Sequence, residues 1–446
     1  MDYAAAVEYL LSFTDLERGV QRSANPTMSL ESVRSLLSRL NDPHLGRPTV
    51  HVTGSKGKGS TAAMIAGILR REGHSAALYT SPHLHAFTER IAIDGESVDP
   101  REFATALEAI KPAIEDERRS VHGNVSTFGI LTALFFWLAR ARLPRVQWQV
   151  VEVGLGGSFD ATNVFDEPDV VVITAISLEH TAILGDTTVA IARDKAGIIK
   201  PGSTCVLAPQ RDRAVVDVVR ARCAEVGAAL VDVGAAYNAE PIEKHPYGQS
   251  FRLTGPSGEM ELRTPMLGRH QLDNAATAVA AAEAIRARGH EISDAAIRDG
   301  IAHTRIPGRM EVMGQRPLVV GDGAHNVESA AALAAAMRDY FQWARCFFVV
   351  GVMNDKDVRG MGFQLARHAE LIVCTRFQSP RSMDPYQMIQ EIGFLGPPAV
   401  AEETVPEAID TALSHADEGD LLCITGSLYV VAEAREYLLG ESATGS

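Results

Sequence analysis

Short apolar runs alternate with alanine-rich stretches of helical character along most of this chain. In the first half, apolar runs of strand length occupy residues 48–54, 74–80, 148–154, 169–176 and 203–209. Strands that alternate with helices are typical of a parallel sheet covered by helices. The first half therefore predicts an α/β domain built on a mostly parallel sheet.

One stretch breaks this alternation. Residues 249–266 alternate apolar and polar side chains on both sides of a turn that contains Gly255, Pro256 and Gly258. A period of two around such a turn predicts a small antiparallel hairpin, which we expect to be appended to the sheet. Two helices are predicted to follow it, at residues 270–289 and 293–304.

The pattern of strands and helices restarts after Pro307 and Gly308, which interrupt regular structure. The next apolar runs occur at residues 317–326, 346–353, 370–376, 399–403 and 421–427. They predict a second, smaller, doubly wound domain. A chain of 446 residues is also longer than one hydrophobic core usually supports. We place the boundary at Ile306, which gives domains of residues 1–306 and 307–446.

Composition and charge exclude several classes of function. Hydrophobic residues make up 46% of the chain, and 42 basic side chains against 56 acidic ones give a net charge of −14. This balance argues against a nucleic-acid-binding surface. The five cysteines are scattered without metal-ligand spacing, which favours a reducing compartment. With no signal peptide and no apolar run of about 20 residues, the sequence predicts a cytoplasmic protein without a membrane segment.

The stretch GSKGKGST, residues 54–61, carries the first chemical signal. It follows a predicted strand and precedes a predicted helix, so its backbone N–H groups and the positive helix end can face an anion. Gly54, Gly57 and Gly59 allow tight turns and a close approach to phosphate oxygens. A flexible surface turn is the alternative, but the flanking strand and helix favour a nucleotide-binding loop.

Three polar side chains of this loop have chemistry suited to a nucleotide. Lys58 can reach the β- and γ-phosphates, and the hydroxyl of Ser60 or Thr61 can bind Mg²⁺. The spacing differs from the common phosphate-loop pattern, because Gly59 separates the lysine from the serine.

Further candidates stand near the ends of predicted strands, where open α/β sheets bind their ligands. Glu152 ends an apolar strand. A lone buried carboxylate is costly, so Glu152 either binds a metal or forms a structural salt bridge. His180 follows another strand, where a histidine more often caps or packs than binds metal. Lys195 lies fifteen positions later, and on its own it would be a solvated charge.

The loop resembles the phosphate loop of the folylpolyglutamate synthase and dihydrofolate synthase family, within the Mur ligase superfamily. Further blocks resemble the family in the same order along nearly the whole chain. They include residues 78–95, 150–163, 176–202, 267–278, 306–312, 321–326, 351–358 and 425–429. The resemblance implies an N-terminal ATP-binding domain of the Mur ligase type and a C-terminal, Rossmann-like glutamate-ligase domain.

The resemblance also implies an activity. Family members use ATP to add L-glutamate to the carboxylate of a folate, and in some cases of dihydropteroate, through an acyl phosphate. The implied cofactors are ATP and Mg²⁺, with a monovalent cation as a further candidate. The expected partners are these small molecules, with no nucleic acid and no membrane, and we expect a monomer.

The family motifs imply roles for individual residues. The expected nucleotide-binding residues are Gly54, Gly57, Lys58, Gly59, Ser60, Thr61, Asn274, Arg309 and Asp322. The expected metal ligands are Ser60, Glu152, His180 and, if CO₂ carbamylates its amine, Lys195. The expected folate-binding residues are Ser81, Pro82, His83, Arg90 and Phe128, and the expected glutamate-binding residues are His325 and Ser427. The expected catalytic residues are Lys58, Lys195 and His325.

Some of these assignments have plain structural alternatives. Asn274 can cap a helix, and Phe128 can be a core aromatic rather than a platform that stacks on a pterin. Lys356, Arg381 and Ser427 each lie on strand-end loops of the second domain and, taken singly, suit a surface role.

Three positions depart from the family pattern. Lys56 stands where the family usually has asparagine, Ser158 where it has arginine, and Gly129 where it has glutamate. We expect Ser158 and Gly129 to border the acceptor pocket, so they affect which folate is accepted.

Two other functions remain open from the sequence. The first is a different Mur-type amide ligase, which residues 80–84 and 351–357 disfavour. The second is an inactive nucleotide-binding regulator, which the retention of Lys58, Glu152, His180 and Lys195 disfavours.

Overall fold

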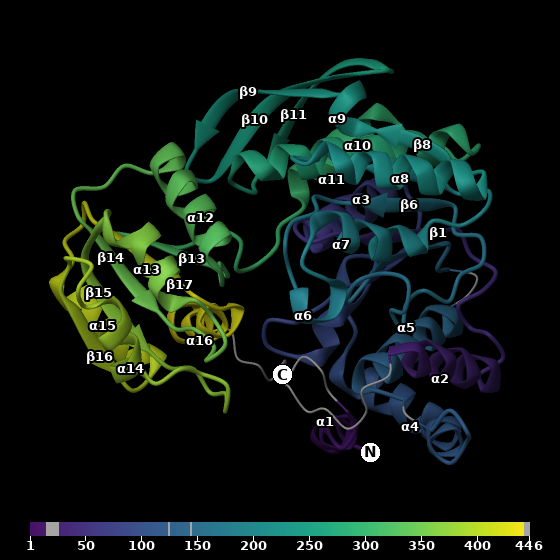
Figure 1. The fold of residues 1–446 in the computed structure, drawn as a ribbon, viewed down its shortest axis with the longest axis horizontal. Coiled ribbons are helices and arrows are strands. Elements are labelled where there is room, and N and C mark those ends of the chain that lie inside the picture. Colours follow the sequence, from purple (N-terminus) through teal and green to yellow (C-terminus); the bar gives the residue numbers. More distant parts are fainter. Residues whose placement is uncertain (15–25, 124, 143–144, 441–446) are drawn as a thin grey trace.

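The computed structural model describes residues 1–14, 26–123, 125–142 and 145–440. Figure 1 shows two sheet-containing parts side by side, the purple-to-teal N-terminal part on the right and the green-to-yellow C-terminal part on the left. Among the described residues, no helix combines the length and apolar character needed to cross a membrane.

The N-terminal part is built on an eight-stranded sheet. Its strands, in spatial order, are β4 (Glu96–Ser97), β3 (Ile91–Ile93), β2 (Ala76–Tyr79), β5 (Trp148–Glu152), β1 (Thr49–Thr53), β6 (Val170–Ile173), β7 (Thr204–Leu207) and β8 (Ala229–Asp232). The six strands from β2 to β8 are parallel, and β3 and β4 form an antiparallel edge. The five predicted strands are therefore confirmed, and they form the centre of the sheet.

Helices cover both faces of this sheet because successive strand residues point to opposite sides. On β5, Val150 packs in a core with the helices of one face, and Val151 packs in a core with those of the other. The first face carries α3 (Lys58–Arg71), α10 (Arg269–Ala287) and α11 (Asp294–His303). The second carries α1 (Tyr3–Leu11), α2 (Pro26–Arg39), α4 (Pro100–Arg118), α5 (Thr127–Ala141), α7 (Thr188–Lys195) and α8 (Arg213–Val226).

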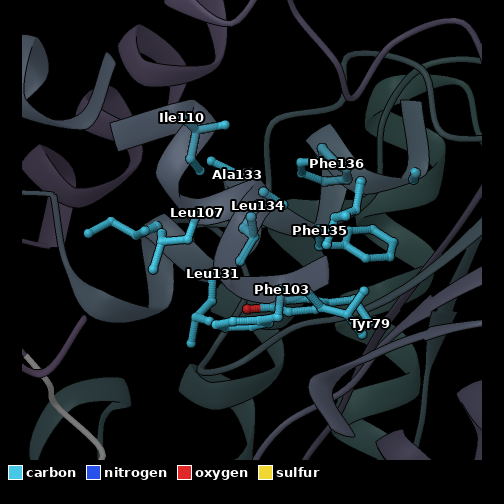
Figure 2. Packing of buried hydrophobic residues seen from close by; sticks show 14 of the residues in the cluster. Tyr79, Phe103, Leu107, Ile110, Leu131, Ala133, Leu134, Phe135 and Phe136 are labelled. Atoms are coloured by element: carbon cyan, nitrogen blue, oxygen red, sulfur yellow. The ribbon is translucent and has the colours of Figure 1, made fainter. Parts of the chain in front are cut away.

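An aromatic cluster fixes α4 and α5 against the sheet. Figure 2 shows Tyr79 of β2 beside Phe103 of α4 and Phe135 of α5, all fully buried. The rings of Tyr79 and Phe135 stack with their centroids 5.1 Å apart. This packing holds the strand end that leads to residues 80–83 in a fixed position.

The predicted hairpin is present as β10 (Gly248–Gly255) and β11 (Gly258–Thr264), but its expected attachment is wrong. It pairs on its other side with β9 (Asn238–His245) and forms a separate three-stranded antiparallel sheet. Strand β9 is mostly exposed, so it carries no apolar periodicity that the sequence could reveal. The short α9 (Val233–Ala236) connects β8 to it.

The C-terminal part contains a six-stranded sheet. Its strands, in spatial order, are β12 (Glu311–Gln315), β13 (Leu318–Asp322), β17 (Leu421–Thr425), β14 (Cys346–Val350), β15 (Ala369–Thr375) and β16 (Ala399–Glu402). All are parallel except β12. One face packs on α12 (Val327–Tyr340), α13 (Val358–Ala366) and α14 (Pro385–Ile392), and the other on α15 (Val405–His415) and α16 (Leu428–Leu439). The doubly wound second domain is confirmed, whereas its boundary at Ile306 stays a prediction.

An ion pair and a hydrogen bond join the two parts at separate places. Lys244 of β9 lies 2.6 Å from Asp339 of α12. Far from there, His85 Nδ1 lies 3.1 Å from the carboxylate of Glu436 in α16. Contacts at both places hold the C-terminal part over the carboxyl ends of the first sheet.

Candidate functional site

A cavity of about 2140 Å³ lies between the two parts and is lined by residues of both. Most of the predicted site residues line it. The exceptions are Gly54, Thr61, Arg90 and Lys195. The structure therefore gathers residues from the phosphate loop, from seven other sequence blocks that resemble the family, and Phe128 around one space.

The loop between β1 and α3 has the shape of an anion-binding turn. Gly57 precedes the first residue of α3 with a φ of 86°, which a side chain rarely adopts. A Cβ at Gly57 would also lie 2.2 Å from the side-chain oxygen of Asn274. Two independent features therefore favour glycine at this position: the backbone φ angle and the close approach of Asn274 in α10. The unpaired N–H groups of the first turn of α3 face the cavity side of the loop, with Lys58, Gly59 and Ser60 as lining residues.

Asn274 is buried and donates to Gln271 Oε1 at 2.9 Å. It lies in the first turns of α10 but caps no helix, since Gly268 occupies the N-cap position. The capping alternative for Asn274 is therefore wrong.

Two lysines share one carbonyl beneath the loop. Lys58 Nζ donates to the oxygen of Gly54 at 3.1 Å, and Lys195 Nζ donates to the same oxygen at 2.8 Å. Lys195 Nζ also lies 2.9 Å from Glu179 Oε1. Sequence reasoning missed Glu179, although it directly precedes His180 at a strand end, which was the available signal.

Lys195 is almost completely buried, with 1% of its side chain exposed. Burial lowers the pKa of its amine, and the positive charge of Lys58 lowers it further, while Glu179 acts in the opposite direction. The solvated role that the sequence alone suggested for Lys195 is wrong. The residue lies behind the cavity wall rather than on it.

Glu152 ends β5 with its carboxylate beside the first turn of α3. It accepts a hydrogen bond from the backbone N–H of Ser81 at 3.0 Å, and a Cβ at Gly59 would lie 3.4 Å from Oε2. Burial raises the pKa of Glu152 to about 6, although the charge of Lys58 opposes this shift. Among the hydrogen bonds and ion pairs of the described residues, no cation pairs with Glu152 at ion-pair distance.

His180 lies at the N-cap of the short helix α6 (Thr181–Leu184) with a φ of 46°. Desolvation lowers the pKa of its imidazole, the charge of Glu179 opposes this shift, and the charges of Lys58 and Lys195 add to it. The ring is therefore neutral at pH 7 and can offer a nitrogen lone pair to a metal. Thr61 is fully buried with no partner for its hydroxyl in the described chain, whereas Ser60 lines the cavity. Of the two hydroxyls proposed from the sequence, Ser60 is the one whose residue lines the cavity.

These groups suit a hard divalent cation. A hydroxyl (Ser60), a carboxylate (Glu152) and a neutral imidazole (His180) line the same cavity. No cluster of three His, Cys, Asp or Glu side chains that could hold a metal occurs among the described residues. An ion bound there would need oxygen ligands from a bound phosphate as well.

On the opposite wall, Asp322 shapes the end of β13. One carboxylate oxygen accepts from the N–H of Met310 and the other from the N–H of Ala324, each at 2.9 Å. Burial raises the pKa of Asp322, and nearby Arg309 lowers it. Asp322 therefore also holds the interdomain segment 308–310 in place, which presents Arg309 to the cavity.

His325 lies three residues after Asp322, the last residue of β13. Its Nδ1 lies 2.9 Å from the carbonyl oxygen of Gly323, which makes Nδ1 the protonated nitrogen and leaves Nε2 as an acceptor. Burial lowers the pKa of His325 to about 4, so the ring is neutral at pH 7. The ring lines the cavity opposite the phosphate loop.

Ser427, Lys356 and Arg381 join the same wall. Ser427 caps α16, and its hydroxyl accepts from the N–H of Tyr429 at 3.2 Å. Lys356 and Arg381 both approach Asp355, at 3.0 and 3.4 Å. All three line the cavity, so their role in the site stays a prediction.

Four of the five predicted folate-binding residues line the cavity. Ser81, Pro82, His83 and Phe128 line it, whereas Arg90 is buried behind His83 and donates to its Nδ1 at 2.8 Å. A Cβ at Gly154 would lie 2.5 Å from Phe128, so the ring edge rests on that glycine. Phe128 also packs against Tyr79, with centroids 5.8 Å apart, and thus serves both the core and the cavity wall.

The three positions that depart from the family pattern have different surroundings. Lys56 lines the cavity, and burial lowers the pKa of its amine. Gly129 lies against Val33, and Ser158 donates to the carbonyl oxygen of Asp194 at 2.8 Å. Neither Gly129 nor Ser158 lines the cavity, so their expected position at its border is wrong.

Two family models match this chain. Residues 52–282 match the Mur ligase middle domain, and residues 308–428 match the Mur ligase glutamate ligase domain. The dihydrofolate synthase/folylpolyglutamate synthase of Bacillus subtilis is 33% identical over 421 residues, with 92% of this chain and 94% of that protein covered.

A longer relative and a solved structure agree. The probable bifunctional folylpolyglutamate synthase/dihydropteroate synthase of Haloferax volcanii is 36% identical over 98% of this chain, which spans about half (50%) of that protein. The structure of Mycobacterium tuberculosis folylpolyglutamate synthase complexed with ADP has a TM-score of 0.87 at 31% identity, covering 98% of this chain and 99% of the other. The chain therefore belongs to the folylpolyglutamate synthase/dihydrofolate synthase family of Mur ligases.

Proposed function

We propose that the protein is an ATP-dependent ligase that joins L-glutamate to the carboxylate of a folate, and to that of dihydropteroate if it has both family activities. One observation carries the proposal. The cavity places a phosphate-binding loop on one wall and His325, Ser427 and Arg381 on the other. ATP and an amino acid can thus approach one acceptor carboxylate from two sides.

The first step transfers the γ-phosphoryl group. An oxygen of the folate carboxylate attacks the γ-phosphorus, the bond to the β–γ bridging oxygen breaks, and ADP leaves. The N–H groups at the start of α3, together with Lys58, hold the phosphates and balance the charge that develops on their oxygens. The chain supplies positioning and charge here, and it forms no covalent bond.

Ser60, Glu152 and His180 are the residues that would hold Mg²⁺. When bound, Mg²⁺ would neutralise phosphate charge and polarise the transferred group. Within the described ranges, the buried Glu152 carboxylate has no cationic partner at ion-pair distance, and this is the observation that favours a metal over a structural salt bridge.

The second step forms the amide. The α-amine of glutamate, after losing a proton, attacks the acyl carbon, and the tetrahedral intermediate releases phosphate. His325 can accept a hydrogen bond from the amine through Nε2, because the carbonyl of Gly323 holds the proton on Nδ1. Arg381 and Lys356 offer positive charge for the glutamate carboxylates.

One chain supplies every group that this mechanism uses, so a monomer suffices. The requirement for ATP fits a cytoplasmic location. A different Mur-type amide ligase would use the same phosphate loop, so the identity of the acceptor distinguishes the two functions.

The test is an assay of ADP release with ATP, L-glutamate and Mg²⁺, in which tetrahydrofolate, dihydropteroate and a cell-wall peptide precursor are compared as acceptors. We expect release with the pterin acceptors only. Lys58→Ala should lower turnover by about 10²–10³ because one positioned cation is lost. Arg71→Ala, on the exposed end of the same helix, is the matched control. Release that depends on the peptide precursor would contradict the folate assignment.

A further inference from the structure

A second cavity lies behind the wall of the first. It has a volume of about 750 Å³ and is lined from the loop after β5, from the end of α7 and from α8. Figure 1 shows α7 and α8 at the same end of the eight-stranded sheet. Ser158 and Ala196 face this cavity, whereas Asp160 and Asp194 face the first one. The two cavities thus share a wall, and no residue lines both.

Three of the residues that line this second cavity are basic: Arg193, Lys200 and Arg222. Arg222 Nη1 pairs with Glu225 at 3.0 Å, which leaves its buried Nε with no partner. In the part of the chain that the structure describes, Lys200 Nζ has no hydrogen bond or ion pair. Burial lowers the pKa of Lys200, as do the charges of Arg34 and Arg222, and Asp166 only partly offsets them.

The acidic residues at the rim are already paired. Asp217 lies 2.9 Å from Arg220, and Glu225 is held by Arg222. They therefore do not neutralise Lys200, and an anion would be drawn to the cavity.

Asn163 adds an unpaired hydrogen-bond acceptor to this cavity. It is 3% exposed, and its Nδ2 donates to the carbonyl oxygen of Ser158 at 3.0 Å. Its Oδ1 is buried with no partner, and an unsatisfied buried acceptor is costly. A ligand that satisfies this site must carry negative charge for Arg222 and Lys200, and also a hydrogen-bond donor for Asn163.

We propose that this cavity is a binding site for inorganic phosphate, distinct from the catalytic cavity. The monohydrogen phosphate dianion has oxygens that accept from Arg222 Nε and Lys200 Nζ, and one P–OH group that can donate to Asn163 Oδ1. It fills only part of the space. Sulfate and a phosphate monoester dianion have similar charge and shape but lack this hydroxyl at pH 8, so the site discriminates against both.

The test is isothermal titration calorimetry at pH 8 in the presence of a saturating non-hydrolysable ATP analogue, which blocks the phosphate loop. The probes are inorganic phosphate, sulfate and methyl phosphate. We expect phosphate to bind at one site, and the other two to bind about tenfold more weakly or not at all, since each leaves Asn163 Oδ1 unpaired.

Two variants and one control locate the site. Arg222→Gln should weaken phosphate binding about tenfold because a charge-assisted hydrogen bond is lost. Arg213→Gln, at the exposed start of the same helix and outside the cavity, should leave phosphate binding unchanged. If circular dichroism shows that Arg222→Gln is unfolded, Lys200→Gln replaces it, and it should also weaken phosphate binding about tenfold.

Three results would overturn the proposal: no saturable phosphate binding in the presence of the analogue, sulfate or methyl phosphate binding as tightly as phosphate, or variants that bind like the unaltered chain. None of these readouts depends on turnover, so they leave the proposed ligase activity untouched.

Discussion

Lys195 and Glu179 form the most constrained ion pair beside the phosphate loop. The amine is buried, it donates to Gly54, and Glu179 supplies its only ion-pair partner among the described residues. Glu179 favours the ammonium form over the free amine, and it would repel a negatively charged carbamate. Glu179 therefore opposes the proposed carbamylation of Lys195, and a substitution of Glu179 can test this.

This gives a prediction for carbon-13 NMR. In ¹³C-bicarbonate at pH 8, the protein should show a carbamate resonance that Lys195→Arg lacks. Glu179→Gln should increase its intensity, because it removes the charge that holds the amine protonated. A spectrum without the resonance in both the unaltered chain and Glu179→Gln would refute the modification but not the ligase.

His325 makes a prediction about stability and pH. Its folded pKa of about 4 is depressed from the ordinary 6.5, so the unfolded chain binds more protons between these values. Stability should therefore rise with pH across this window and be lost as the pH falls from 6.5 towards 4. At pH 5 this should cost about 2 kcal/mol. Chemical denaturation at pH 7.5 and at pH 5 measures how much free energy of unfolding each protein loses. The loss should be about 2 kcal/mol smaller for His325→Gln than for the unaltered chain. Equal losses would contradict a buried neutral ring.

At the residue level, the sequence could identify side chains but not their neighbours. Lys58, Glu152 and His325 were recognisable because each follows a strand within a motif. The Lys195–Glu179 pair was not, because it depends on how α7 packs beneath the loop that leaves β1. The burial of Arg90 behind His83 likewise follows from packing and not from spacing.

The contact between the phosphate loop and α10 matters at the level of elements. Gly57 and Gly73 flank α3 with φ angles of 86° and 97°, yet only a Cβ at Gly57 would strike another element, through Asn274. Gly73 has open space around it. An alanine at Gly73 would introduce backbone strain alone, whereas an alanine at Gly57 would introduce the strain and also displace the loop. Comparing the two variants therefore separates the two effects.

We expect Gly73→Ala to lower the free energy of unfolding by about 1–2 kcal/mol and to leave activity unchanged. Gly57→Ala should cost at least as much stability and should also lower ADP release about tenfold or more, because the N–H groups of the loop are moved off the phosphates. Thermal denaturation and the ADP assay measure both. Equal activities of the two variants would show that the loop does not position phosphate.

The sequence predicted the long, buried elements well. The central parallel strands and the C-terminal doubly wound sheet were visible because their residues are apolar on both faces. Strands β4, β8 and β9 were missed because they are short or mostly exposed edge segments. Their pairing is decided by the sheet that they join, which local periodicity does not encode.

At the scale of the whole molecule, the site exists only where the two parts meet. The proposed nucleotide and glutamate sites lie on opposite walls, so the first sheet alone lacks the groups proposed to receive the amino acid. His325→Ala should raise the KM for glutamate about tenfold while the Kd for ADP stays unchanged. Steady-state kinetics and ADP titration check this, with the exposed His415→Ala as control. An unaltered glutamate dependence would place the amino acid elsewhere.

The position of β1 in the middle of its sheet has a consequence for synthesis of the chain. Val50 is paired with Val150 on one side and with Val170 on the other, so both neighbours are made a hundred residues or more after it. Contacts of such sequence separation form slowly, and unpaired strands are prone to aggregate. On the ribosome, we expect the phosphate loop to stay unformed until residue 173 has emerged, so chains that stall before that point should need chaperones rather than nucleotide to remain in solution.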